Sequence, residues 1–176
     1  KGGYGTTVLT APNTYTGGTT VSQGILQLGG NAGTVVVPNG GLTISGATVT
    51  MLNNPGQIAS DNAVTFNNGA VLTLFGENVL QSLNFNNYGS SSAANVTTAG
   101  TLTLSSNTPI LVTSQDAANT PYIAGTLAFL QGVSTLNIGA IQIDGRTYTD
   151  TQQSLEITAA IKGAGVTLQK TGNGVL

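Results

Sequence analysis

Cysteine and histidine are both absent from this chain of 176 residues. Without cysteine there can be no disulfide framework and no thiolate metal site. Without histidine as well, most nucleophile, proton-relay and zinc arrangements of enzymes are excluded. We therefore expect no catalytic residues, no bound metal and no cofactor, and we interpret the chain as a protein that is not an enzyme.

Charge is also scarce, because only 6% of the residues are charged and the formal net charge is −2. Ordinary soluble domains carry about 25% charged residues. Four lysines and arginines cannot neutralise a track of phosphates, so we expect no nucleic-acid partner. The sequence has neither a basic amphipathic helix nor an unbroken apolar run of about 18 residues, so we expect no membrane insertion by this segment.

What the chain does contain is glycine, threonine, serine and asparagine, with 25 glycines in all. This composition fits an exported bacterial protein, and we expect an extracellular or cell-surface location on the bacterial outer surface. The chain begins at Lys1 without an initiator methionine, so we expect it to be an internal segment of a longer protein.

Apolar and polar residues alternate in short runs between glycine, asparagine and proline breaks, which is the pattern of half-buried strands. No window shows a convincing helical stripe, and residues 90–94 are expected to be a loop. The sequence predicts an all-β fold. The expected strands are 6–10, 19–21, 24–28, 34–37, 42–45, 47–52, 63–66, 71–75, 80–85, 101–104, 109–113, 122–130, 134–138, 140–143, 146–149, 155–161, 166–169 and 175–176.

A glycine followed by alternating apolar residues recurs along the chain. Gly5 and Gly24 are 19 residues apart, Gly100 and Gly125 are 25 apart, and Gly165 lies 40 beyond Gly125, close to two steps of twenty. Periods of about 20 to 30 residues without helices are typical of a solenoid. We therefore predict a parallel β-helix with about 20–30 residues per coil, with an antiparallel sandwich or barrel as the alternative.

One nine-residue stretch organises the rest of the chain. It combines a hydroxyl-rich turn, two adjacent glycines that permit backbone angles other residues avoid, and the start of a strand. We interpret it as a structural repeat motif that lets one coil pass to the next. Its residues are Asn13, Thr14, Tyr15, Thr16, Gly17, Gly18, Thr19, Thr20 and Val21.

A second, shorter repeat joins the two ends. The run from Lys170 to Gly174 (Lys-Thr-Gly-Asn-Gly) restates the run from Lys1 to Gly5 (Lys-Gly-Gly-Tyr-Gly) at three of five positions, 169 residues apart. We expect residues 1–176 to form a single β-solenoid segment that covers one period of a longer tandem-repeat protein.

Read across that join, the segment 170–176 followed by residues 10–28 resembles the autotransporter-associated β-strand repeat, also called the passenger-associated transport repeat. Its members share a Lys-Thr-Gly-x-Gly strand, an Asn-Thr-Tyr-Thr-Gly-Gly-Thr-Thr-Val turn and a Gly-x-Leu-x-Leu finish. The resemblance covers about residues 1–30 and 150–176. It implies a right-handed parallel β-helix in large secreted passengers of Gram-negative and related bacteria. The motif is associated with secretion and folding of the passenger, and the resemblance implies no catalytic residues.

Polysaccharide-cleaving enzymes need two carboxylates at short range. Asp144 and Asp150 are the nearest such pair, with Arg146 between them, and we interpret Asp144 as the head of a tight Asp-Gly turn. Calcium would need several acidic ligands from one loop, and the acids here are too dispersed. The carboxylates are Asp61, Glu77, Asp116, Asp144, Asp150 and Glu156.

Asparagines and tyrosines are the residues that could bind a sugar without acid chemistry. The pairs 53–54, 67–68 and 86–87 could line a glycan-binding face, but stacked asparagines that bond to one another and to turn backbone are the stronger interpretation. Tyr88, Tyr122 and Tyr148 could stack on sugars, although packed tyrosines are ordinary. Asn95 heads a glycosylation-type triplet, which is frequent by chance in such a sequence.

Three functions follow from these observations. The leading hypothesis is a structural module of an extracellular stalk or fibre, whose partners are neighbouring repeats of the same protein, with possible end-to-end self-association into fibres. The second is an adhesin that contacts polysaccharide or the cell surface, binding host or matrix glycans through one lateral face. The third, a polysaccharide-degrading enzyme, is disfavoured because paired acids are lacking.

Overall fold

Alternation of buried and exposed side chains runs through most strands of the computed structural model, which describes residues 1–148 and 152–176. Seventeen strands and no helix occur in these residues, so no helix there could span a membrane. The strands are β1 (Thr6–Leu9), β2 (Thr19–Val21), β3 (Ile25–Leu28), β4 (Leu42–Ser45), β5 (Thr48–Met51), β6 (Ala63–Asn67), β7 (Val71–Leu74), β8 (Asn78–Leu80), β9 (Ser82–Asn87), β10 (Asn95–Leu104), β11 (Ile110–Ser114), β12 (Tyr122–Phe129), β13 (Val133–Ile143), β14 (Arg146–Tyr148), β15 (Glu156–Ile157), β16 (Ala160–Lys162) and β17 (Thr167–Thr171).

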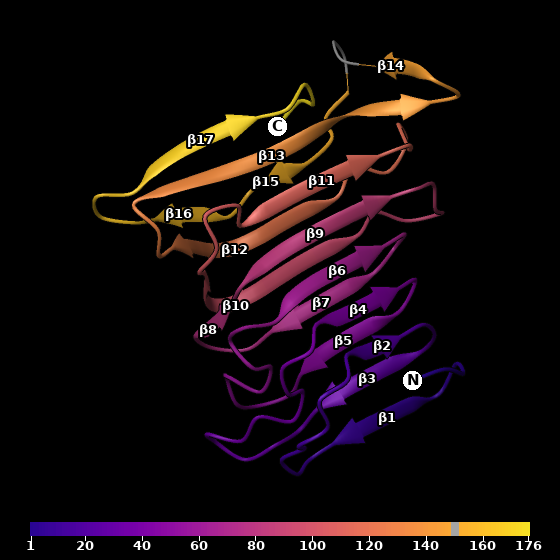
Figure 1. Ribbon diagram of the computed structural model, residues 1–176. Coiled ribbons are helices and arrows are strands. Elements are labelled where there is room, and N and C mark those ends of the chain that lie inside the picture. Colours follow the sequence, from indigo (N-terminus) through magenta and orange to yellow (C-terminus); the bar gives the residue numbers. More distant parts are fainter. Residues whose placement is uncertain (149–151) are drawn as a thin grey trace.

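These strands form two sheets, and the chain climbs from one coil to the next between them (Figure 1). The first sheet has the order β1-β3-β5-β7-β10-β12-β15, with β8 and β16 beside β10 and β12. The second sheet has the order β14-β13-β11-β9-β6-β4-β2, with β17 beside β13. All pairs are parallel except β13 with β14. The predicted parallel β-solenoid is confirmed, and the antiparallel sandwich or barrel is wrong.

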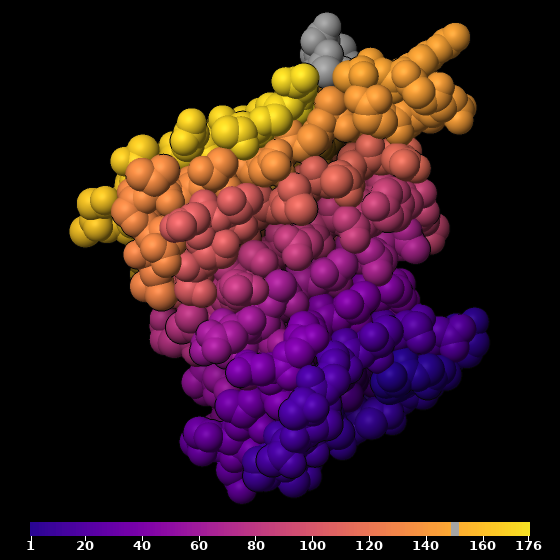
Figure 2. Space-filling model, viewed as in Figure 1, coloured from indigo at the N-terminus to yellow at the C-terminus, as the bar shows by residue number. Residues whose placement is uncertain are grey.

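The strand register gives the length of each coil. Thr6 pairs with Ile25, 19 residues later, and Tyr122 pairs with Glu156, 34 residues later. The step from Gly100 to Gly125 is one coil, as predicted, since Thr101 pairs with Thr126. The expectation of two coils between Gly125 and Gly165 is wrong: Thr126 pairs with Ala160, because the β13–β14 hairpin lengthens this coil. In Figure 2 the hairpin projects beyond the stacked coils.

The core lies inside the stack and is built from columns of like residues. In the second sheet the register places one apolar side chain of each coil above the previous one. The rings of Phe66 and Phe85 stack at 4.8 Å between centroids and 15° between planes. Burying such a side chain stabilises the fold by about 1.5–3 kcal/mol. The column consists of Val21, Ile44, Phe66, Phe85, Val112 and Ile138, all fully or almost fully buried.

The first sheet bends at a corner made of stacked glycines. The first half of β10 pairs with β7 and its second half with β8, so the sheet turns within β10. A Cβ atom on Gly100 would lie 2.4 Å from the carbonyl of Gly76, and one on Gly125 would lie 2.3 Å from the Thr98 carbonyl oxygen. Only glycine permits this close approach of backbones between coils.

Strand boundaries differ from the sequence prediction at two informative places. The expected strand 34–37 is reduced to a single bridge at Val37, because Val36 and Val37 are both buried and both donate to the carbonyl of Gln57. The expected strand 155–161 divides into β15 and β16, because Thr158 and Ala159 both donate to one carbonyl of β12. The sequence also missed the first six residues of β10, the division of the expected strand 80–85 between β8 and β9, and the reduction of the expected strand 175–176 to a bridge at Val175. The remaining boundaries move by smaller amounts or join neighbouring runs. The loop predicted at 90–94 lies outside every strand, as expected.

Candidate functional site

The repeat motif Asn13–Val21 begins as a largely exposed connector and ends in β2, whose last residue, Val21, is fully buried. The Asn13 side-chain amide donates to the Val36 carbonyl at 2.8 Å, in the following coil. Tyr15 and Thr19 join their hydroxyls at 2.6 Å across the turn. The Thr19 amide donates to the Gly41 carbonyl at 2.9 Å. These contacts hold the motif against the coil that follows it.

Glycine at position 18 is required by contact rather than by backbone angle. Neither Gly17 nor Gly18 has a φ in the left-handed region, so the expected conformational role of this pair is wrong. A Cβ atom on Gly18 would lie 2.7 Å from the Gly40 carbonyl oxygen, whereas one on Gly17 would meet nothing within 4 Å. The motif therefore presses bare backbone against the Gly40 turn of the next coil.

Lys1 closes the corner where the chain passes from the second sheet to the first. Its ammonium donates to the carbonyls of Gly3, Gly5 and Gln23, the last of these one coil further on. Its backbone nitrogen donates to the carbonyl of Thr20 in β2. One cation therefore satisfies several carbonyls of two successive coils.

Lys170 repeats this corner at the other end of the stack. It lies in β17 of the second sheet, and its ammonium donates to the Gly172 carbonyl at 2.9 Å. Gly172 has a φ of 76°, and Gly3 has a φ of 80°. Both runs therefore make the same local turn, at the passage from the second sheet to the first. The short repeat proposed from the sequence has a matching geometry.

The acid pair considered from the sequence, Asp144 and Asp150, is only half described by the structure. Asp144 has a φ of 50° and Gly145 a φ of 73°, as a tight turn between β13 and β14 requires, which confirms the turn predicted there. Asp150, its expected neighbour, lies outside the described residues. Within residues 1–148 and 152–176 no group of three or more acidic side chains could hold a metal ion.

Asp116 is the one carboxylate with a shifted pKa in the described part of the chain. Partial burial raises the pKa, but hydrogen bonds from Ala118, Asn119 and Ser90 outweigh it and lower the pKa below 3.8. The Ala118 amide donates at 2.7 Å and the Asn119 side chain at 3.1 Å. Because Ser90 belongs to the previous coil, the carboxylate joins two successive loops.

Asparagine side chains stack between coils as the sequence indicates. Asn86 donates to Asn67 at 3.0 Å, and Asn67 donates to the Ser45 hydroxyl at 3.0 Å. The sequence did not single out the buried amides that satisfy the loop backbone. Asn62 is fully buried, accepts from the Gly41 amide at 2.7 Å and donates to a carbonyl at 3.0 Å.

The three tyrosines considered as sugar platforms are dispersed. Tyr88 directly follows β9 and is 52% exposed, Tyr148 lies in β14, and Tyr122 begins β12. Asn95, the glycosylation candidate, begins β10 and pairs with strands on both sides. Of the three, Tyr88 lines the pocket described next.

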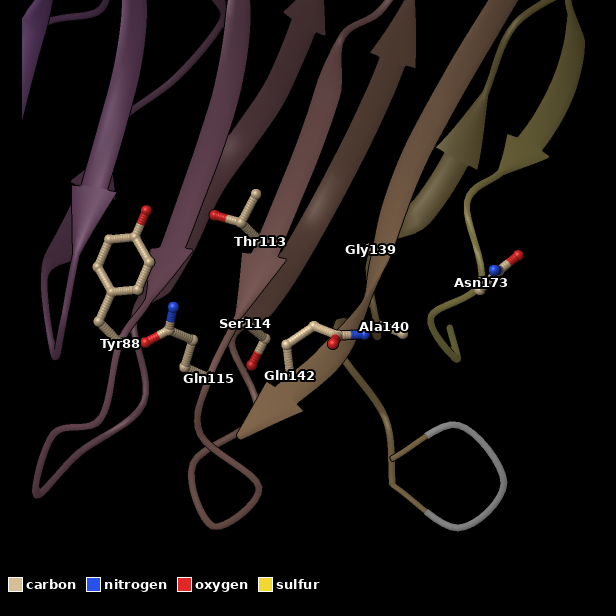
Figure 3. A pocket seen from close by; sticks show the side chains of 8 residues that line it. All are labelled: Tyr88, Thr113, Ser114, Gln115, Gly139, Ala140, Gln142 and Asn173. Atoms are coloured by element: carbon tan, nitrogen blue, oxygen red, sulfur yellow. The ribbon is translucent and has the colours of Figure 1, made fainter. Parts of the chain in front are cut away.

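That pocket is a groove on the side of the solenoid, where strands of the second sheet end (Figure 3). Its volume is about 460 Å³. We call it the lateral groove. Figure 3 shows Tyr88 at one end of a row of polar side chains and Asn173 at the other. It is lined by Tyr88, Thr113, Ser114, Gln115, Gly139, Ala140, Gln142 and Asn173.

Of this lining, the sequence pointed to Tyr88 alone. Gln115, Gln142 and Asn173 come from different coils, and only the register brings them together. The Asp-Gly turn after β13 was the available signal, because it marks the hairpin beside the groove.

Comparison with known proteins matches one end of the chain. Residues 1–28 match the family model of the passenger-associated-transport-repeat. The match contains β1, the motif Asn13–Val21 and β3, and confirms the resemblance over these residues. Searches of curated proteins and of solved structures found no match.

Proposed function

We propose that this chain is a non-enzymatic structural module of a secreted bacterial surface protein. In this proposal it forms part of an extracellular β-solenoid stalk or fibre, and its partners are neighbouring repeats of the same protein. The observation that carries the proposal is the corner made by Lys1 and made again by Lys170. The family match over residues 1–28 supports the same function.

The second corner is a place where a further coil fits. Besides its local bonds to Gly3 and Gly5, Lys1 donates to the Gln23 carbonyl of the coil that follows it at 2.9 Å. A following copy would bring its equivalent of Gln23 to the same position beside Lys170. The cation would then join two copies as Lys1 joins two coils.

The end strands carry the backbone groups for that junction. β1 pairs only with β3, and β17 pairs only with β13 among the described strands. Open edges of parallel strands are templates for pairing with another chain. In tandem copies each edge would be covered by its neighbour, and the low charge of the chain opposes this stacking little.

The repeat motif would assist folding during secretion, because it joins its own coil to the next. Its bonds from Asn13 to Val36 and from Thr19 to Gly41 span about one coil each. In a solenoid each repeat contacts only its neighbours, so folding can advance coil by coil. A motif that binds the next coil in this way would set its register.

Electron microscopy of chains with one, two and four copies tests the proposal. The copies are joined so that Lys170 is replaced by Lys1 of the next copy, which preserves the spacing of 169 residues. Coils spaced by about 4.8 Å predict a rod of constant width that lengthens by about 34 Å per copy.

The matched control replaces Lys170 by Ile25 of the second copy, so that the corner residues 21–24 are missing and the first-sheet strand β3 follows directly on β17 of the second sheet. This chain should show a gap or kink at each junction. Separate beads in the chains with the preserved spacing would contradict the proposal.

A further inference from the structure

The floor of the lateral groove is made by a β-bulge between β11 and β13. Val112 pairs with Ile138 and Ser114 pairs with Ile141, so Gly139 and Ala140 together lie opposite a single residue of β11. Bulges are frequent beside functional sites, because they redirect side chains and interrupt pairing. Here the bulge places two small residues where a longer side chain would fill the groove.

Glycine is needed at the centre of this floor. A Cβ atom on Gly139 would lie 2.7 Å from the Val112 carbonyl oxygen. The backbone therefore approaches β11 closely and forms a flat shelf. Such a shelf can receive a ring laid against it, and a volume of about 460 Å³ has room for one or two sugar rings.

The wall of the groove is held by the β13–β14 hairpin. The Gln142 side-chain amide donates to the Thr147 hydroxyl at 2.6 Å, which fixes the side chain and leaves its carbonyl oxygen to accept. On the opposite side, the Thr113 hydroxyl donates to the Asn86 side chain at 3.0 Å. Insertions in solenoids gather on one face, which is often the binding face.

Tyr88 supplies an aromatic surface at the end of the row. Its side chain is 52% exposed, and Figure 3 shows its ring beside the Gln115 amide, with Gln142 further along the groove. An exposed ring with an apolar face and a wet hydroxyl is suited to stacking on the C–H face of a sugar. Amides and hydroxyls around it supply both donors and acceptors for sugar hydroxyls.

The lining contains no ionisable group other than the Tyr88 phenol. The nearby carboxylate of Asp116 is already occupied by hydrogen bonds from Ser90, Ala118 and Asn119. The lining also has no basic side chain that could pair with the carboxylate of an acidic sugar. The groove is therefore chemically matched to a neutral ligand rather than a charged one.

We propose that the lateral groove binds a neutral saccharide, with one sugar ring stacked on Tyr88 and its hydroxyls bonded to Gln115, Gln142 and Asn173. This gives the chain a binding activity in addition to a structural one, and it does not depend on whether copies stack.

Saturation-transfer NMR on the full chain tests this site. The probes are millimolar lactose, maltose, cellobiose, mannobiose and diacetylchitobiose, with digalacturonic acid as the charged comparison. We expect transfer to at least one neutral disaccharide. Tyr88→Ala should weaken its binding about tenfold, since an aromatic contact of this kind is worth about one factor of ten. Gln142→Ala should weaken it as well.

Tyr4→Ala is the matched control, because Tyr4 is 86% exposed and lies just before β1, at the end of the stack far from β11 and β13 in the strand order. This variant should bind like the unchanged chain. Absence of transfer to every neutral probe would overturn the proposal. The proposal would also be overturned if Tyr88→Ala and Gln142→Ala bound the sugar as tightly as the unchanged chain does. Binding of digalacturonic acid as tight as that of the best neutral sugar would overturn it too.

Discussion

Lys1 and Lys170 make the same hydrogen bond at opposite ends of the solenoid, each ammonium donating to the carbonyl of the residue two positions later. The accepting glycines, Gly3 and Gly172, share a left-handed backbone with φ values of 80° and 76°. Both corners pass from the second sheet to the first. The short sequence repeat at residues 1–5 and 170–174 thus corresponds to one turn that occurs at both ends, and this turn is the basis of the proposed stacking.

Replacing the two motif glycines by alanine should affect stability to different degrees. Gly18→Ala places a Cβ atom 2.7 Å from the Gly40 carbonyl oxygen, so we expect a loss of about 1–3 kcal/mol in the free energy of unfolding. Gly17→Ala meets nothing within 4 Å and should change stability by less than about 1 kcal/mol. Urea denaturation followed by circular dichroism measures both. Equal losses would show that close contact with Gly40 does not explain the motif.

The stacked rings in the core should dominate the stability of the central coils. Phe66→Ala removes a fully buried ring that stacks on Phe85, and should lower the free energy of unfolding by about 3–5 kcal/mol. Phe75→Ala is the control, because Phe75 is 44% exposed, and should cost about 0.5 kcal/mol. The same denaturation measurement applies, and similar losses in the two variants would argue against the column as the core.

A buried amide should matter as much as an apolar side chain. Asn62→Ala leaves the Gly41 amide and the Pro38 carbonyl without their side-chain partner. Each unpaired buried group costs about 1–3 kcal/mol, so the variant should be clearly destabilised. Asn107→Ala, at an exposed asparagine, should leave stability nearly unchanged. Calorimetric melting compares them, and an unshifted melting temperature for Asn62→Ala would contradict the assignment.

Acid should weaken the link between two loops through Asp116. Its pKa is lowered in the folded state, so ionisation stabilises the fold above the ordinary value of 3.8, and this stabilisation is lost as the pH falls below it. Asp116→Asn should remove this dependence. Comparing unfolding of the two chains at about pH 6 and about pH 2.5 isolates the contribution. If both chains lose the same stability between these values, the hydrogen bonds to Asp116 carry no net effect.

The fold was largely predictable because its signals are local. Alternation predicts strands such as β4, and Pro38-Asn39-Gly40 predicts the break before it. Spacing between glycines predicts coil length only where no insertion intervenes. The step from Gly125 to Gly165 failed for that reason, since the β13–β14 hairpin adds residues without adding a coil.

The lateral groove could not be predicted, because it depends on register between coils. The sequence predicts a break at Gly139, between the expected strands 134–138 and 140–143, but not that one strand continues through it with a bulge against β11. Tyr88, Gln142 and Asn173 are far apart in the chain and meet only through stacking. The glycine contacts at Gly18 and Gly100 were hidden in the same way, since each involves backbone of another coil.

Hydrogen exchange at the Lys170 amide tests the proposed stacking most directly. The Thr167 amide donates to the Gly132 carbonyl at 2.8 Å, so strand alternation places the Lys170 amide on the opposite edge of β17. At the other end, the Lys1 nitrogen donates to the Thr20 carbonyl. In a two-copy chain the amide at the junction should therefore donate to Thr20 of the second copy. We predict fast exchange of this amide in the single chain and slow exchange in the two-copy chain, with Thr167 protected in both. Equally fast exchange in the two chains would contradict a continuous solenoid.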